Sequence, residues 1–288
     1  MPGIVLNKFD IRSRGGLPIA TDVRFCEDCP GRERYKPAVF LLHGFKSYKD
    51  WGFMPVAAEY FAENGFISCS FNFSHSASID PIEERYDAEL FKGMTVSGEL
   101  EDLDVVIESL IDGAQPFTAV KPLWDGRIYL IGHSLGGALS LLYSAQKPRR
   151  IDKVALWASV SKVDRQAQRQ KEEWKKLGYS NLTAGRHRQP LKLSAEYIYD
   201  IEKNFPGDAI LRAAGRITIP ALVIHGTIDV LVKTSEAHAL REALKNSPDL
   251  RFELIERTGH AFSCENPCVK PSPALEKILG ITKTFLHL

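Results

Sequence analysis

Residues 127–137 read RIYLIGHSLGG. The run 127–131 is apolar and of strand length, the next five residues match G-x-S-x-G, and a pattern with helical spacing follows. A strand, a sharp turn with serine at its apex and a helix form the arrangement in which this motif presents a nucleophile. Because the two arms of such a turn approach closely, small residues must flank Ser134, and Gly132 and Gly136 meet that need. The motif therefore predicts a strand–turn–helix unit with Ser134 exposed at its tip.

Short apolar runs alternate with amphipathic stretches on both sides of this unit. The strand-length runs are 38–42, 66–71, 127–131, 153–158, 221–225 and 251–255. Most are apolar on both faces, as parallel strands covered by helices must be, whereas polar residues alternate in 251–255 and favour a place nearer the sheet edge. The stretches with helical spacing are 56–62, 99–110, 139–143, 240–244 and 275–285.

This alternation is typical of an α/β fold with a mostly parallel sheet and right-handed crossovers. The first segment differs, because residues 8–11 and 20–25 flank Gly15 and Gly16 and predict an antiparallel hairpin at the sheet edge. From 162 to 216 the chain is polar, charged and weakly helical. An insertion of that length between two strands favours a functional cap, and the alternative is a solvated helix pair without a role in binding. We therefore expect a core of residues 1–161 and 217–288 with a cap insertion at 162–216.

Composition excludes some classes of function. The 288 residues carry 37 Lys plus Arg and 36 Asp plus Glu, a formal net charge of +1, and 44% of them are hydrophobic. Neither a nucleic-acid footprint nor a polybasic membrane patch is expected from that balance. No signal peptide is recognisable at the start, and no apolar run reaches the length of a membrane span. We expect a cytoplasmic protein, a monomer or a homodimer, that acts on a small molecule without nucleic-acid or membrane-spanning partners.

Five cysteines are present, and an odd number does not resemble a disulfide framework. It fits a reducing compartment, so free thiols are the expectation. The alternative is a zinc site in which Cys26 and Cys29 join Cys264 and Cys268, which requires the fold to bring the two pairs together. No metal is expected.

A serine hydroxyl becomes a useful nucleophile when a base takes its proton. The base should be a histidine on a loop after the last strand, and His260 follows the run 251–255 directly. Asp229 follows the buried run 221–225 and is the expected partner of that histidine, with Asp164, beyond the preceding run, as the alternative. The chain order Ser134, Asp229, His260 is the order that the G-x-S-x-G context requires.

An acyl-transfer intermediate also needs donors for its oxyanion. One is expected from the backbone amide of Leu135, after the nucleophile, and the other from the amide of Phe45, in the loop after residues 38–42. His43 is expected to fix that loop by hydrogen bonding. Lys46 and Asp50 are expected to form a surface ion pair of little energetic weight.

With these residues in place, the chain resembles the α/β-hydrolase superfamily, and within it the cinnamoyl and feruloyl esterases and the monoglyceride-lipase-like enzymes. The resemblance covers nearly the whole chain and is carried by residues 43–45, 132–136, 225–229 and 259–260. It implies an eight-stranded sheet, a cap after the sixth strand and no cofactor. Val230 follows Asp229 where such sequences often continue Val-Pro, a difference of no expected consequence.

The function predicted from these residues is hydrolysis of carboxylic esters through an acyl-serine intermediate. Amidase or peptidase activity and acyl transfer are alternatives that use the same triad, and a catalytically silent ligand-binding homologue is an alternative of another class. Trp174 and Tyr179 in the insertion have two interpretations: they line a substrate pocket, or they anchor the insertion on the core.

Overall fold

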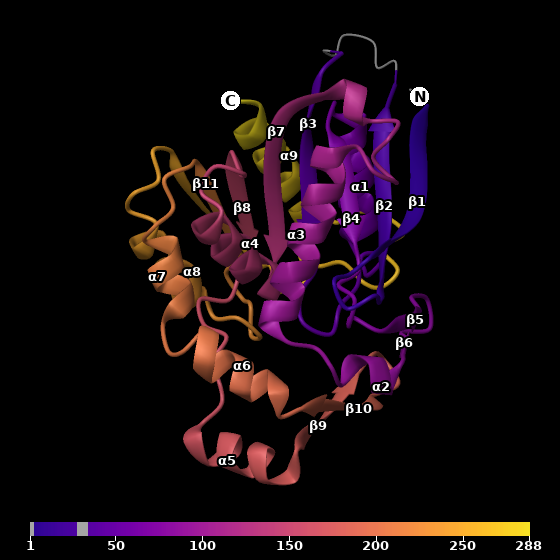
Figure 1. Cartoon of the computed structure of the whole chain (residues 1–288). Coiled ribbons are helices and arrows are strands. Elements are labelled where there is room, and N and C mark those ends of the chain that lie inside the picture. The colour runs from indigo at the N-terminus through magenta and orange to yellow at the C-terminus, as the bar shows by residue number, and fades with distance from the viewer. Residues whose placement is uncertain (1–2, 28–33) are drawn as a thin grey trace.

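The computed structural model describes residues 3–27 and 34–288, and an eight-stranded sheet runs through it (Figure 1). Its strand order is β1 (Ile4–Arg12), β2 (Pro18–Cys26), β4 (Ile67–Phe71), β3 (Lys36–Leu42), β7 (Trp124–His133), β8 (Lys153–Trp157), β11 (Ala221–Gly226) and β12 (Leu250–Ile255). β2 pairs antiparallel with both β1 and β4, and all other pairs are parallel. The predicted parallel sheet and antiparallel edge hairpin are confirmed, and the strand with polar alternation, β12, is the opposite edge.

Helices cover both faces of the sheet, so the core has two layers. On one face α1 (Met54–Glu63) and α9 (Pro273–His287) share an apolar layer with the side chains of Val39 and Leu41 in β3. On the other face α3 (Val96–Asp112), α4 (Leu135–Gln146) and α8 (Thr234–Ala243) share an apolar layer with Phe40 and Leu42. Figure 1 shows α3 and α4 in front of the sheet and α9 behind it. Successive side chains of β3 therefore belong alternately to the two apolar layers, as expected for a strand that helices cover on both faces.

Local capping fixes several of these helix ends. The Thr95 hydroxyl accepts a hydrogen bond from the Gly98 amide at the start of α3, and the helix ends at Gly113, which has a φ of 70°. Ser272 caps α9 by accepting from the Leu275 amide. Polar N-caps and a left-handed C-terminal glycine satisfy backbone groups that the helix leaves unpaired. These boundaries follow from the local sequence.

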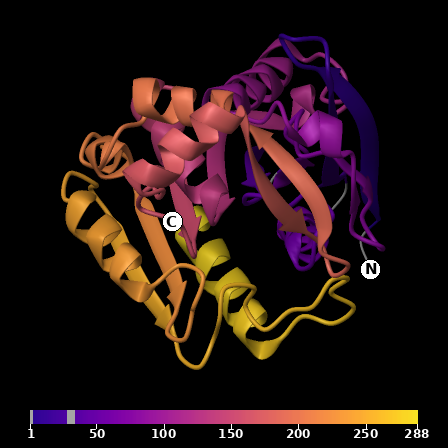
Figure 2. The same cartoon turned by 90° about the horizontal axis from the view of Figure 1, so that it is seen from below.

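The 162–216 segment folds after β8, the sixth strand of the sheet in chain order. It contains α5 (Gln168–Leu177), the antiparallel strands β9 (Tyr179–Ala184) and β10 (Gln189–Ser194), α6 (Glu196–Asn204) and α7 (Ala209–Ala214). Figure 1 shows α5, α6 and the hairpin beyond the end of the sheet where β7 finishes, and Figure 2 views that end from below. α7 packs on the core helices α4 and α8. Close to the hairpin lie β5 (Ser78–Asp80), β6 (Arg85–Tyr86) and α2 (Ala88–Phe91), and a short 3-10 helix, η1 (Lys121–Leu123), precedes β7.

The cysteines differ from the expectation of free thiols. Cys26, buried at the end of β2, is disulfide-bonded, which corrects the prediction at that position. Cys69, Cys264 and Cys268 are free. An odd number of cysteines means that not all of them can form disulfides, but it does not exclude a single disulfide. The number of cysteines was therefore an insufficient basis for the prediction. Cys29 lies outside the described residues.

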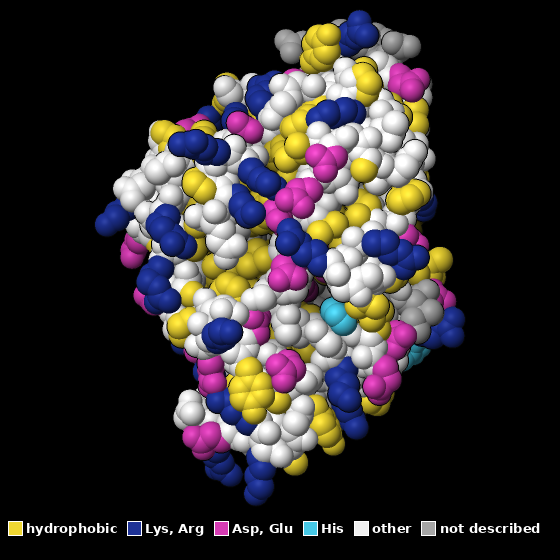
Figure 3. Space-filling view, viewed as in Figure 1, with side chains coloured by type: hydrophobic (Ala, Val, Ile, Leu, Met, Phe, Trp, Pro, Cys, Tyr) yellow, Lys and Arg dark blue, Asp and Glu magenta, His cyan; other side chains and the backbone are white. Residues whose placement is uncertain are grey.

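Residues 3–27 and 34–288 contain neither a candidate membrane span nor a cluster of metal-binding side chains. No helix there is both long and apolar enough to cross a bilayer. No group of three or more metal-binding side chains gathers there either. Figure 3 shows positive and negative side chains interspersed over the visible face, in keeping with the near-zero net charge.

Candidate active site

Ser134 sits at the junction between β7 and α4 with a φ of 56° and a ψ of −117°. A non-glycine residue in this region is strained by about 1–3 kcal/mol and persists when the surroundings hold it. Here the Ser134 amide donates to the Trp157 carbonyl at 2.9 Å. A Cβ on Gly132 would lie 2.2 Å from the Gly136 carbonyl oxygen, and one on Gly136 would lie 2.3 Å from that of Leu42. The close approach expected of the G-x-S-x-G turn is therefore present.

The structure brings His260 and Asp229 together from the loops after β12 and β11. The His260 Nδ1 lies 2.7 Å from Asp229 Oδ2, and the Asp229 side chain is fully buried. Asp229 Oδ1 accepts from the amides of Leu231 and Val232, both at 2.9 Å. Asp164, the alternative partner, instead pairs with Lys171.

Two opposing effects act on the pKa of Asp229. Burial raises this pKa, but the hydrogen bonds from His260 and from the Val232 and Leu231 amides outweigh burial, and the pKa lies below its usual value. The carboxylate is therefore ionised at neutral pH. A charged carboxylate at Nδ1 keeps the His260 proton on that nitrogen and leaves Nε2 free as an acceptor.

Two more histidines surround this pair, and motif analysis did not assign them a role. His225 Nε2 donates to the Val232 carbonyl at 2.8 Å and lies 3.4 Å from Asp229 Oδ2. His133 Nε2 lies 3.0 Å from the His260 carbonyl oxygen. Burial lowers the pKa of His133 to about 3 and also lowers that of His225, so both rings are neutral near pH 7. In the sequence His133 directly precedes Ser134 and His225 lies four residues before Asp229. The groups that these two rings contact, however, come from loops that local sequence does not place.

The loop after β3 passes beside the nucleophile. A Cβ on Gly44 would lie 3.0 Å from Ser134 Cβ and 3.5 Å from its Oγ. Within residues 3–27 and 34–288, the amides of Phe45 and Leu135 have no hydrogen-bond acceptor. The buried ring of His43 joins the loop to its surroundings, with Nδ1 3.0 Å from the Gly44 carbonyl oxygen and Nε2 accepting from the Phe73 amide at 3.3 Å.

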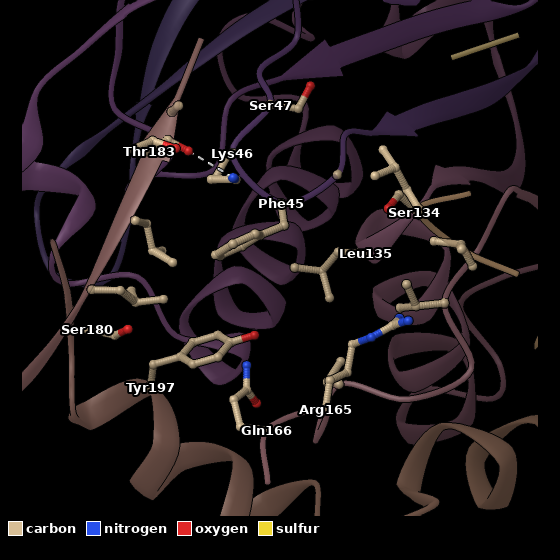
Figure 4. Close-up of a pocket in the computed structure, with 18 of the residues that line it drawn as sticks. Phe45, Lys46, Ser47, Ser134, Leu135, Arg165, Gln166, Ser180, Thr183 and Tyr197 are labelled. Carbon is tan, nitrogen blue, oxygen red and sulfur yellow. Dashed lines mark hydrogen bonds between the residues drawn. The ribbon is translucent and has the colours of Figure 1, made fainter. Parts of the chain in front are cut away.

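The prediction of an ion pair between Lys46 and Asp50 is wrong. Asp50 pairs with Lys49 at 2.7 Å. Lys46 Nζ instead donates to the Thr183 carbonyl in β9 at 2.9 Å (Figure 4). Lys46 has a left-handed backbone, with a φ of 58°, and lines the cavity described next.

A cavity of about 1070 Å³ separates the 162–216 segment from the core. Ser134, His260, Phe45 and Leu135 line it, and so do many residues of the segment and of the loop around residue 46. The Ser134 hydroxyl lies at its wall (Figure 4). In the described part of the chain this hydroxyl makes no hydrogen bond, and such bonds commonly tighten once substrate binds.

Trp174 and Tyr179 both line the cavity. Trp174 also anchors α5, because its Nε1 donates to the Leu193 carbonyl at 2.9 Å and its ring stacks on Tyr197 with centroids 5.8 Å apart. Tyr179 packs under Lys192, whose Nζ lies 4.3 Å from the ring centroid. The two interpretations of Trp174 are therefore compatible in this geometry.

Sequence reasoning missed several cavity residues. Gln166 and Tyr197 both line the cavity, and Figure 4 shows them in its lower part. Gln166 Oε1 is buried and has no hydrogen-bond partner among the described residues, and burial raises the pKa of Tyr197. Arg165, on the same wall, pairs with Glu236 of α8. No motif marks these residues, because the path of the insertion alone brings them to the cavity.

Comparison with known proteins agrees with this architecture. A family model described as "alpha/beta hydrolase fold" matches residues 37–180, half of the chain. The monoacylglycerol lipase ABHD6 of Bos taurus is 21% identical over 282 residues, which span 85% of this chain and 76% of that protein. Its Homo sapiens counterpart is 22% identical with the same shares.

Solved structures with the same fold include esterases and a lipase. Est1E from Butyrivibrio proteoclasticus matches with a TM-score of 0.66 and 17% identity, over 98% of each chain. The Paleococcus ferrophilus monoacylglycerol lipase matches with a TM-score of 0.64 and 17% identity, over 93% of this chain and 98% of that one. Together with the family match and the strand–serine–helix turn, these similarities show that the chain belongs to the α/β-hydrolase family.

Proposed function

We propose that this protein is a serine hydrolase that cleaves carboxylic esters through an acyl-serine intermediate. The observation that carries the proposal is the hydrogen bond of 2.7 Å between His260 and the buried Asp229, at a cavity that Ser134 also lines. The printed names of similar proteins support an ester substrate: several are monoacylglycerol lipases, and Est1E was solved with ferulic acid bound.

Each step of the proposed mechanism uses a group described above. Ser134 Oγ attacks the ester carbonyl while His260 Nε2 takes its proton, and Asp229 holds the imidazole tautomer and stabilises its positive charge. The amides of Phe45 and Leu135 donate to the oxyanion. The carbon–oxygen bond to the alcohol then breaks, and the alcohol leaves with the proton from His260. Water, activated by the same base, releases the acid and restores the serine.

In this proposal the 162–216 segment is the cap. It supplies much of the cavity wall, including Trp174 and Tyr179, and it excludes bulk water from the reacting ester. The wall combines apolar and polar residues, as is usual for a small-molecule site.

A Ser134→Ala variant tests the function. We expect turnover of 4-nitrophenyl acetate to fall by about 10³-fold or more and labelling by a fluorophosphonate probe to disappear, because both require the hydroxyl. Ser140→Ala is the matched control, since that serine bonds to the Gly136 carbonyl inside α4. Equal turnover in the Ser134→Ala and control proteins contradicts the proposal, and a matched ester and anilide pair distinguishes esterase from amidase activity.

A further inference from the structure

Lys46 is a cation in the cavity wall that no carboxylate neutralises. Its side chain is partly buried, and Nζ donates to the Thr183 carbonyl at 2.9 Å. No Asp or Glu of the described residues lies within the 4.0 Å that defines an ion pair with it. Burial lowers the pKa of Lys46, since part of its hydration is lost without compensation by a negative charge.

The other charged side chains of the cavity wall either have an ion-pair or hydrogen-bond partner or are exposed to solvent. Arg165 is paired with Glu236. Glu84 accepts hydrogen bonds from the Asn266 side chain and the Arg186 amide. Lys162 and Glu173 lie at exposed positions and keep their hydration. Lys46 is therefore the partly desolvated cation that an incoming anion can reach with the least competition.

The backbone holds Lys46 in place for such a contact. Its φ of 58° is a left-handed conformation that is uncommon for a lysine. The Tyr86 hydroxyl donates to the Lys46 carbonyl at 3.0 Å, and Nζ reaches across to β9. An ammonium group has three donors, and the bond to Thr183 uses one. Figure 4 shows the amine beside Phe45 in the cavity that also contains Ser134.

We propose that Lys46 binds a carboxylate group of the substrate, so that this site prefers esters carrying a free carboxylate over neutral esters of the same size. The inference rests on the ester-hydrolase function proposed above and specifies its substrate class. The carboxylate belongs either to the acyl part or to the alcohol part of the ester, and one pair of substrates tests each position. In each case the ammonium replaces water around the anion with a charge-assisted hydrogen bond.

Paired substrates measure this preference directly. For the acyl side the pair is monomethyl adipate and methyl hexanoate, and for the alcohol side it is 4-acetoxybenzoate and its methyl ester. In the wild-type protein we expect a higher kcat/KM for the anionic member of at least one pair. In Lys46→Met the anionic-to-neutral ratio should fall about tenfold or more, mainly through KM, and Lys46→Arg should retain much of it.

The control is Lys162→Met, which removes an exposed lysine of the same cavity wall. Its anionic-to-neutral ratio should change by less than about twofold, because water screens an exposed charge. If Lys46→Met instead lowers kcat/KM for both members of each pair equally, the lysine serves to tether the Phe45 loop to β9, and the proposal is overturned.

A binding measurement separates failure of this inference from failure of the enzymatic function. Calorimetric titration of Ser134→Ala with monomethyl adipate and methyl hexanoate should show tighter binding of the anion, and Ser134→Ala/Lys46→Met should lose that difference. This result would support carboxylate recognition even in a chain that hydrolyses none of the four esters. If the anion binds no more tightly than the neutral ester in Ser134→Ala, or if the difference is the same in the double variant, carboxylate recognition by Lys46 is overturned even in an active esterase.

Discussion

At the scale of single residues, the environment of one carboxylate distinguishes Asp229 from its rival. Asp229 is fully buried and receives two backbone amides besides His260, whereas Asp164 is bound to Lys171 and the Gly207 amide. Two backbone amides and the His260 imidazole together hold the Asp229 carboxylate in one orientation. Lysine, with a flexible stem, does so less well.

An Asp229→Asn variant should therefore lower kcat for ester hydrolysis by roughly 10³-fold or more with a small change in KM. The amide keeps the shape of the side chain but cannot stabilise the imidazolium or favour the required tautomer. Steady-state kinetics with 4-nitrophenyl acetate measure the effect. Asp164→Asn is the control and should retain activity within a factor of about three. A larger loss in Asp164→Asn than in Asp229→Asn would reverse the assignment.

Buried neutral histidines give the protein a pH-dependent stability. Burial lowers the pKa of His43 from 6.5 to about 4, although the bond to Gly44 partly opposes this. Below pH 6.5 the unfolded chain takes up a proton that folded His43 does not, so the stability from its neutral form is complete above 6.5 and is lost as pH falls toward 4.

As pH falls from 6.5 toward 4, the free energy of unfolding should decrease more steeply in the wild type than in His43→Gln. The two slopes should differ by up to about 1.4 kcal/mol per pH unit. Urea titrations at pH 7, 6 and 5 measure the two slopes. Any loss of stability common to all pH values reports lost packing and does not affect the comparison. Parallel slopes would mean that His43 takes up its proton over the same pH range in the folded and unfolded protein, and would contradict the lowered pKa.

At the scale of elements, the β7–Ser134–α4 turn depends on backbone contact that only glycine permits. The Cβ of Gly132→Ala would lie 2.2 Å from the Gly136 carbonyl oxygen and 2.5 Å from the Gly137 nitrogen. Neither neighbour is a flexible side chain, so the strand and the helix must separate.

We therefore predict that Gly132→Ala lowers the free energy of unfolding by about 3 kcal/mol or more, measured by chemical denaturation. Gly280→Ala in α9 is the control, because nothing lies within 4 Å of its added Cβ and alanine favours a helix. That control should be neutral or more stable by up to about 1 kcal/mol. A Gly132→Ala protein as stable as Gly280→Ala would mean that the turn opens without cost.

At the scale of the whole molecule, polar bonds tie the 162–216 segment to the core at several points. Asp200 in α6 accepts from the Ser97 amide at 2.9 Å and from its hydroxyl, at the start of α3. Gln189 in β10 bonds to both the amide and the carbonyl of Tyr86. These bonds fix α6 and β10 of the segment to residues 97 and 86 of the remaining chain.

Loss of one attachment should be visible in both stability and binding. We expect Asp200→Ala to lower the free energy of unfolding by about 2 kcal/mol, because the Ser97 amide loses its acceptor. We also expect KM for esters to rise more than kcat falls, because α6 carries the cavity residue Tyr197 whereas Asp200 itself does not line the cavity. Denaturation and steady-state kinetics measure the two effects. Asp208→Ala, which breaks an exposed pair with Arg212 in the same segment, should change neither. Identical behaviour of the two variants would show that the Ser97 contact contributes nothing.

Much of the fold could be predicted from local patterns. Apolar runs, capping residues and glycines mark where strands and helices begin and end, because backbone preferences and short-range hydrogen bonds act over a few neighbouring residues. The antiparallel edge hairpin and the position of Ser134 belong to this class. The disulfide at Cys26 does not, because a count of cysteines holds no information on which side chains meet.

The amino-acid sequence by itself determined the order of the elements, the serine turn and the candidates Asp229 and His260. Only the tertiary structure decided that His260 meets Asp229 and not Asp164, that Lys46 reaches Thr183 across 137 positions, and that Gln166 and Tyr197 face one cavity. The physical reason is that periodicity reports on neighbours along the chain, whereas a side chain's distant partner depends on how the sheet and the insertion pack as a whole.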